Sequence, residues 1–291
     1  MEWYVFAVLS ALFAALAPIA DKKSLKSLNG LEFSTVFAIS NFIILIPLVF
    51  FISSNVPLEI MAVLFVGSIF GTFGFLLVMK GMKKLPISIV SPMKNFDPAI
   101  LAVLAFFVLG EKFTIRQIIG VTMIVIGAYS IEVKNHDLTN PLKTFFFSNK
   151  SKLYLFILLS GILYGFSSII DKVVLSAINP LQYILIAHAF IAFNFSVLTV
   201  IANKPDLKRI SSDIGKSAKW VLAASLLTVS YRLLQAIAVS MANVSLVIPV
   251  RHLSVLFTTT IGGKLFHEKH LLHRTISALI MLVGAWLIIS A

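Results

Sequence analysis

Ionisable side chains that interrupt long apolar stretches are the first feature of this sequence that could perform chemistry. Five lie deep within such stretches, and they are Lys94, Asp97, Arg232, Arg251 and His252. A charge at the centre of a membrane-spanning helix costs roughly 2.5–3.5 kcal/mol, so residues of this kind generally face a cavity and serve a function. His188 is a weaker sixth candidate, and Asn95 beside Lys94 adds a neutral hydrogen-bonding group. We predict that these residues line a substrate path.

The three cations in this set favour an anionic ligand. A guanidinium group binds a carboxylate or a phosphate through two parallel hydrogen bonds, and a lysine adds a point charge. Asp97 follows Lys94 by three residues, on the same helix face, where the two side chains can pair. The sequence offers the two arginines no carboxylate in the central part of the membrane. The other carboxylates near the spans are expected at span ends, and they are Asp21, Asp171, Glu111 and Glu268.

Two alternatives remain open for these charges. They can simply neutralise one another, or their long side chains can extend to the membrane surface. If protons drive transport, Asp97 is the first candidate for the carrier, because it is the one carboxylate predicted near the midplane. His252 is the second, since an unperturbed imidazole titrates near neutrality.

Two prolines occupy matching positions before two of the cations. Pro92 precedes Lys94 by two residues, and Pro249 precedes Arg251 by two residues. A proline removes one helical hydrogen bond and kinks the helix. Broken helices at corresponding positions of two halves are typical of transporter binding sites, so we predict that both prolines break helices beside the site. The alternative is that proline is commoner in membrane helices in general.

Membrane-spanning helices must position these residues. Of the 291 residues, 59% are hydrophobic and 12% are charged, whereas a soluble domain carries about 25% charged residues. Charge-free runs such as Trp3–Ala20 and Phe33–Ser53 are long enough to cross the hydrocarbon core as helices. We predict an all-α polytopic membrane protein with ten transmembrane helices. Their expected bounds are 3–20, 33–53, 59–79, 86–109, 115–132, 153–170, 181–202, 219–242, 245–266 and 274–290.

The two halves of the chain repeat each other. With a shift of 150 residues, ten of the 28 residues from 4 to 31 are identical to their partners, and Asp21 thereby meets Asp171. Further along the shift is 157, so that Gly127 meets Gly284, and the seven additional residues are expected in the connection Asn203–Lys219. Because each copy has five spans, the second copy must be inverted. We predict two inverted five-helix repeats, residues 1–140 and 141–291, as in many secondary transporters.

Lysine and arginine residues are distributed unevenly between the two predicted sides of the membrane. The connections after odd-numbered spans hold 18 of them, whereas the even connections and the termini hold three. Positive residues gather on the cytoplasmic side. We therefore expect a multi-pass inner-membrane protein with both termini extracytoplasmic. The residues before the first apolar run carry no positive side chain, which favours a retained span over a cleaved signal peptide.

One pattern is shared by both halves. In the first half Ser88–Pro92 leads to Gly110-Glu111-Lys112, and in the second half Ser245–Pro249 leads to His267-Glu268-Lys269. This pattern resembles the EamA family of the drug/metabolite transporter superfamily, and the stretch Val247–Thr258 is similar to the start of the ninth span in its members. The resemblance implies a ten-helix transporter of small metabolites with a central cavity lined by both halves. Many members are thought to keep both termini in the cytoplasm, and the lysine distribution here predicts the reverse.

Other motifs in the chain favour structural roles. Gly67 with Gly71, and Gly161 with Gly165, form G-x-x-x-G seams for helix packing. The segment His267–His270 is one residue short of the H-E-x-x-H zinc motif and is expected to be a wet, basic connection. We expect no metal, no cofactor and no nucleotide-hydrolysing domain, and the net charge of +12 is assigned to membrane topology rather than to nucleic-acid binding.

We thus predict a secondary transporter, not an enzyme, for a small metabolite that carries a carboxylate or a phosphate. Its partners are the small-molecule substrate, the lipid bilayer and a coupling proton or counter-ion. The runner-up is an exporter of lipophilic drugs, which should show aromatic side chains around a lone carboxylate. An intramembrane enzyme is a remote third, because His188 and His252 alone do not form a catalytic constellation. The sequence gives no indication of an oligomeric state.

Overall fold

In the computed structural model of the chain, residues 2–52, 56–94, 114–130, 148–202, 207–241, 250 and 253–290 are described. All regular structure within these ranges is helical, as the need to satisfy backbone hydrogen bonds within lipid requires. Six helical segments are long and apolar enough to cross a membrane, so the prediction of an all-α, multi-pass membrane protein is confirmed. They are α1 (Trp3–Ser24), α2 (Gly30–Leu45) with the 3₁₀ helix η1 (Ile46–Phe51), α3 (Leu58–Lys84), α8 (Ser151–Leu175), α9 (Pro180–Ala202) and α13 (Leu271–Ile289).

The remaining helices are shorter or less apolar. They are α4 (Ile87–Met93), α6 (Ile115–Ser130), α10 (Leu207–Met241), the π-helix η4 (Thr258–Gly262) and α12 (Gly263–Leu265). The expected bounds of the spans agree with the helices to within a few residues at most of the ends that are described. The number of ten spans remains a prediction.

Three departures from the expected spans have local physical causes. Helix α10 begins at Leu207, about twelve residues before the apolar part of the span, because helical hydrogen bonds continue beyond the edge of an apolar stretch. Most of the connection Asn203–Lys219 is therefore helical, and the expected start of this span at residue 219 was too late. The second span ends in the tighter η1, whose Pro47 has no N–H for an α-helical hydrogen bond. The ninth span contains η4, a π-helical turn of a kind frequent at functional sites.

Repeated residues begin the second helix of each half in the same way. In α2, the Asn29 side chain accepts hydrogen bonds from the backbone N–H groups of Leu31 and Glu32, and Glu32 closes the capping box. At the start of α9, Asn179 accepts from the N–H of Leu181 at 2.8 Å, and Gln182 replaces the glutamate. The identity of the two asparagines across the repeat therefore has a structural role.

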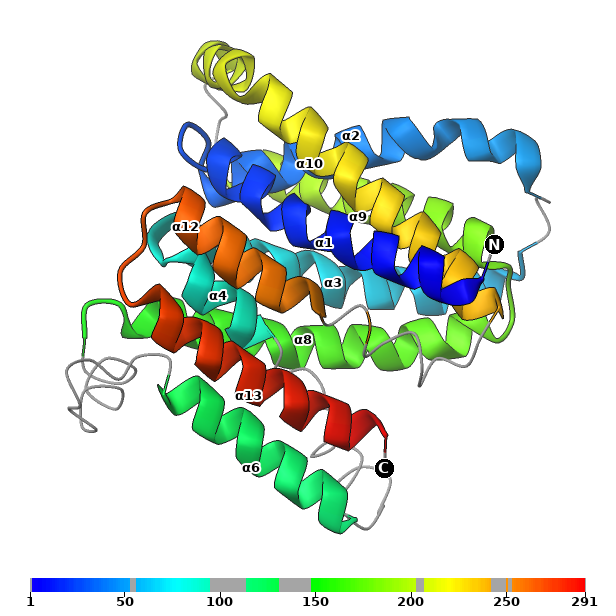
Figure 1. Cartoon of the computed structure of the whole chain (residues 1–291). Helices are drawn as coiled ribbons and strands as arrows, with labels where there is room; N and C mark the ends of the chain where they lie inside the picture. Colours follow the sequence, from blue (N-terminus) through cyan, green and yellow to red (C-terminus); the bar gives the residue numbers. More distant parts are fainter. Residues whose placement is uncertain are drawn as a thin grey trace.

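The helices pack mainly in four pairs, in which α1 contacts α10, α3 contacts α8, α2 contacts α9 and α6 contacts α13. Figure 1 shows α10 running along α1 and the pair α6–α13 at one flank of the molecule, with both chain ends near helix termini. The first pair is antiparallel, since Ser10 donates to the carbonyl of Tyr231 whereas Ser27 bonds Ser217. These pairs form the frame that positions the polar side chains described below.

Glycines allow two of these pairs to approach closely. A Cβ on Gly67 of α3 would lie 2.7 Å from Ile170 of α8, which agrees with the predicted packing seam, whereas Gly71 has only an ordinary contact at 3.6 Å. A Cβ on Gly284 of α13 would lie 2.6 Å from the carbonyl oxygen of Gly120 in α6. A side chain is thus excluded at Gly284 because a backbone atom of the neighbouring helix occupies the space, and at Gly67 because the Ile170 side chain does.

Candidate functional site

Arg232 lies in α10 within a polar cluster that draws side chains from three helices. Tyr231 precedes it in α10, Asp171 belongs to α8, and Tyr183 and His188 belong to α9. The Tyr183 hydroxyl hydrogen-bonds the Asp171 carboxylate, and the Arg232 guanidinium hydrogen-bonds the Tyr231 side chain. Arg232 also interacts electrostatically with Asp171, Tyr183 and His188. We call these five residues the Arg232 cluster.

The guanidinium of Arg232 keeps an unused donor. The residue is partly exposed, while its Nε atom is buried and has no hydrogen-bond partner in the described part of the chain. A guanidinium has five N–H donors and no acceptor, so an unpaired N–H calls for a carboxylate, phosphate or carbonyl oxygen. The prediction that Arg232 is placed to bind an anion is compatible with this geometry.

Asp171 corrects one premise of the sequence analysis. Arg232 was expected to have no carboxylate within reach, and the structure places Asp171 in electrostatic contact with it. The expectation failed because Asp171 is close to the end of its own helix, while the packing of α8 and α10 against α9 brings it towards the arginine. Part of the charge of Arg232 is therefore balanced within the protein.

The surroundings of His188 favour a structural role over ligand binding. The residue is 4% exposed, and its Nδ1 lies 2.8 Å from the carbonyl oxygen of Ile184, one turn earlier in α9. Since a carbonyl oxygen can only accept, Nδ1 carries a proton, and this nitrogen is used within its own helix.

Lys94, the second of the predicted site cations that the structure describes, has an acidic neighbour on another helix, and its expected partner Asp97 lies outside the described residues. It follows α4 as the C-terminal cap residue and is partly exposed. Asp21 of α1 interacts with it electrostatically, although Asp21 was predicted at a span end. Asp21 is 6% exposed, and its Oδ1 has no hydrogen-bond partner among the described residues. A buried carboxylate oxygen of this kind is costly, so the lysine is a stabilising neighbour.

Several predicted site residues lie outside the described part of the chain. They are Asn95, Asp97, Pro249, Arg251 and His252. Pro92 is described and is buried in the last turn of α4, two residues before Lys94 as expected. The predicted roles of all these residues stay predictions.

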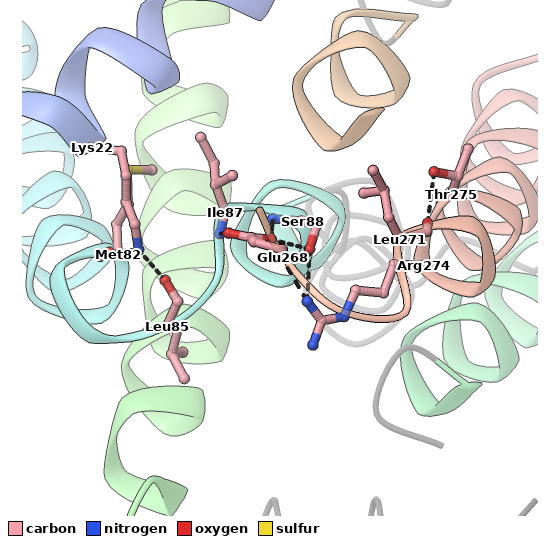
Figure 2. A network of polar contacts seen from close by, with 9 residues as sticks. All are labelled: Lys22, Met82, Leu85, Ile87, Ser88, Glu268, Leu271, Arg274 and Thr275. Atoms are coloured by element: carbon pink, nitrogen blue, oxygen red, sulfur yellow. Dashed lines mark hydrogen bonds and ion pairs between the residues drawn. The ribbon is translucent and has the colours of Figure 1, made fainter. Parts of the chain in front are cut away.

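A second polar network lies at the end of the molecule where α3 passes into α4. Both oxygens of Glu268 cap the start of α4, since Oε1 accepts from the N–H of Ile87 at 2.7 Å and Oε2 accepts from the N–H of Ser88 at 3.0 Å. The Ser88 hydroxyl donates to the same carboxylate. Arg274 of α13 donates to the Ser88 hydroxyl at 2.9 Å and lies 3.6 Å from Glu268. Figure 2 shows these side chains converging on Ser88.

Lys22 of α1 stabilises the turn between α3 and α4 by hydrogen bonding. Its Nζ donates to the carbonyl oxygens of Met82, at 2.6 Å, and Leu85, both at the end of α3. The last carbonyls of a helix lack intrahelical partners, and a lysine there also complements the helix dipole. The short connection between α3 and α4 is thus held by Lys22 on one side and by Glu268 on the other, as Figure 2 shows.

Glu268 is the exception in a segment that was expected to be a wet connection, since His267, Lys269 and His270 are exposed whereas the Glu268 side chain is buried. Its side chain and that of Arg274 are only 8% and 7% exposed. The turn that carries it is tight, with His267 and His270 both in the left-handed region at φ 52° and 58°. The sequence pattern showed this glutamate at matching positions of both halves, and that repetition was the signal for a specific role. Which helix it would cap could not be inferred, because the partner lies 180 residues away.

The described residues include no group of three or more histidine, cysteine, aspartate or glutamate side chains that could hold a metal ion. Comparison with known proteins gives the context for the two polar networks. The family model of the EamA-like transporters matches residues 1–132 and, a second time, residues 151–290. The chain belongs to the EamA-like transporter family. This family is part of the drug/metabolite transporter superfamily, in agreement with the resemblance noted in the sequence.

Two further proteins resemble the chain. An uncharacterized transporter of Clostridium kluyveri is 26% identical over 147 residues, which make up 48% of this chain and 47% of that protein. The match thus spans about half the length of this relative. A protein solved by crystallography aligns over 97% of this chain and 94% of its own, with a TM-score of 0.64 and 12% identity. At that identity the second likeness shows the fold alone.

Proposed function

We propose that this EamA family member is a secondary transporter of a small metabolite that carries a carboxylate or a phosphate. It works by alternating access, in which two inverted five-helix halves, residues 1–140 and 141–291, move relative to each other around a central site. Arg232 and Lys94 contribute to that site, together with Arg251, His252 and Asn95. The family membership and the apolar helices support the transport function.

The unpaired Nε of Arg232 is the observation that supports an anionic substrate. A partly exposed guanidinium with an unpaired, buried Nε is costly within a membrane protein unless a ligand completes its hydrogen bonds. Asp171 leaves the cluster near neutrality, so an anion would bind by hydrogen bonding to the guanidinium as much as by net charge.

The helix pairs support the inverted repeat. Exchanging the two halves replaces α1 by α8, α3 by α10, α2 by α9 and α6 by α13. The pair α1–α10 then becomes α8–α3, which is also present, and the pairs α2–α9 and α6–α13 become themselves. A packing that is unchanged by exchange of the halves is expected when a twofold pseudosymmetry axis relates them.

Individual contacts repeat in the same way. A Cβ on Gly284 would lie 2.6 Å from the carbonyl oxygen of Gly120, and one on Gly127 would lie 2.9 Å from the carbonyl oxygen of Ser277. With the shift of 157 residues, Gly127 corresponds to Gly284 and Gly120 to Ser277. The two close approaches are therefore images of each other, which supports the equivalence of α6 and α13.

The proposal includes the location and orientation of the protein. We place it in the inner membrane with both termini extracytoplasmic, because the lysines and arginines of the connections gather on one side. The network around Glu268 lies at the end that this orientation makes cytoplasmic.

The test of the substrate class is a thermal-shift screen of the purified protein against sodium salts of small carboxylates and phosphates. Bound anions should raise the melting temperature of the wild type and leave that of Arg232→Gln unchanged. Lys219→Gln, which removes a charge from the same helix outside the cluster, should respond as the wild type does. If lipophilic cations raise the melting temperature and anions do not, the drug-export alternative is favoured and the anion proposal fails.

A further inference from the structure

The network around Glu268 joins the two proposed halves of the chain. Ser88 belongs to α4 of the first half, whereas Glu268 and Arg274 belong to the second half. We call these three residues the latch. Its contacts run between elements separated by about 180 residues, and every side chain in it is buried.

Close packing surrounds the latch. A Cβ on Gly262 would lie 3.1 Å from the Ile87 side chain, and one on Gly263 would lie 3.4 Å from the Cβ of Ser88. Both glycines therefore lie against the first turn of α4. All residues from Ile87 to Met93 are buried.

The contacts of the latch are of a kind that can open and close. Separating an apolar seam would expose hydrocarbon to water, but the carboxylate, guanidinium and N–H groups of the latch can each be hydrated when they part. The helix that the latch holds is short, follows the tight connection at Leu85 and Pro86, and contains Pro92. Such an element can pivot with little loss of helical hydrogen bonding.

We propose that the latch is a gate that closes one end of the transport path and breaks as a unit when the protein opens to that end. The inference rests on the proposed alternating access. Glu268 acts as a positioning residue, because it fixes the start of the helix whose other end is capped by Lys94. Closing the gate thus also sets the place of a proposed substrate-binding side chain.

Labelling of an introduced cysteine tests the gate without any substrate. The chain has no cysteine, so Ser91→Cys gives a unique thiol on α4, at a position that is 6% exposed. In nanodiscs this thiol should react slowly with fluorescein maleimide in the wild-type background. Adding Glu268→Gln should speed the reaction about tenfold, since hydrogen bonds to a charged group are worth at least that factor in an opening equilibrium.

Matched variants separate the gate from a general loss of structure. Lys269→Gln changes an exposed neighbour in the same turn and should leave the labelling rate unchanged. Arg274→Lys retains the charge but loses the planar guanidinium, so it should increase the labelling rate by less than Glu268→Gln does. If Glu268→Gln does not fold, the labelling rate of Arg274→Lys is the test. Equal labelling rates in wild type and in the folded latch variant would overturn the proposal.

Failure of the gate and failure of the transport proposal give different results. Anion-induced thermal shifts depend on Arg232 and should persist in Glu268→Gln. If the latch variants change the labelling rate but no anion shifts the melting temperature, the gate proposal stands and the proposed substrate class is wrong.

Discussion

Substitution of Gly284 by alanine tests the close approach of α6 and α13. The added Cβ would lie 2.6 Å from the carbonyl oxygen of Gly120 and 3.0 Å from atoms of Met123 and Ile124. Ordinary contacts between such atoms begin near 3.5 Å, so the two helices must separate by about 1 Å. Backbone atoms cannot rotate away as a side chain can. Overpacking of this kind costs about 1–3 kcal/mol.

The comparison must allow for the intrinsic preference of helices for alanine, which is worth about 1 kcal/mol over glycine. Gly71→Ala provides the matched control, because its Cβ would meet only the Ser167 hydroxyl oxygen, at 3.6 Å. The difference in unfolding free energy between Gly284→Ala and Gly71→Ala should therefore be about 1–3 kcal/mol. Gly127→Ala should lower the unfolding free energy as Gly284→Ala does, since the added Cβ would clash with Ser277 and Met281.

Thermal unfolding of the purified variants, followed by tryptophan fluorescence, measures the difference. Gly284→Ala and Gly127→Ala should both melt below Gly71→Ala by several degrees. Equal melting of all three would refute the close approach of the helices. A loss confined to one of the two substitutions would refute the equivalence of the two contacts under exchange of the halves.

Two further predictions concern the backbone and the orientation. His270 is exposed, and its backbone lies in the left-handed region. His270→Gly should therefore raise the free energy of unfolding by about 0.5–1 kcal/mol, and His270→Ile should lower it by about 1–2 kcal/mol. Thermal unfolding measures both changes, and a more stable isoleucine variant would show that the backbone is not left-handed at this residue. Reporter fusions should behave as extracytoplasmic after residue 291 and as cytoplasmic after Lys150, and the opposite behaviour at both points would reverse the orientation while leaving the fold unchanged.

Most of the fold could be predicted because it depends on features local to the sequence. A run such as Ile60–Met79 has no stable state in lipid other than a helix, and α3 covers it. Asn29 and Asn179 are identical across the repeat, and the structure gives both of them a capping role that was not predicted. The start of α10 was missed because hydropathy reports where the membrane ends and not where the helix ends.

The candidate site was harder to predict because its partners come from different helices. Arg232 was identified from its depth in an apolar stretch, but the approach of Asp171 depends on how α8 and α10 flank α9. Glu268 was expected to be solvated because the N–H groups that donate to its carboxylate belong to a helix distant in the sequence. In both cases the repetition of a polar residue across the halves was a better guide to importance than its predicted depth.

The most direct test of the proposed function is counterflow of a labelled anion into proteoliposomes. The anion is the best ligand from the thermal-shift screen, and the vesicles contain no nucleotide. Wild-type protein preloaded with unlabelled anion should accumulate the label transiently, whereas Arg232→Gln, at equal amounts of folded protein, should not. Counterflow by Arg232→Gln at the wild-type rate would contradict the role of Arg232 and the anion site with it.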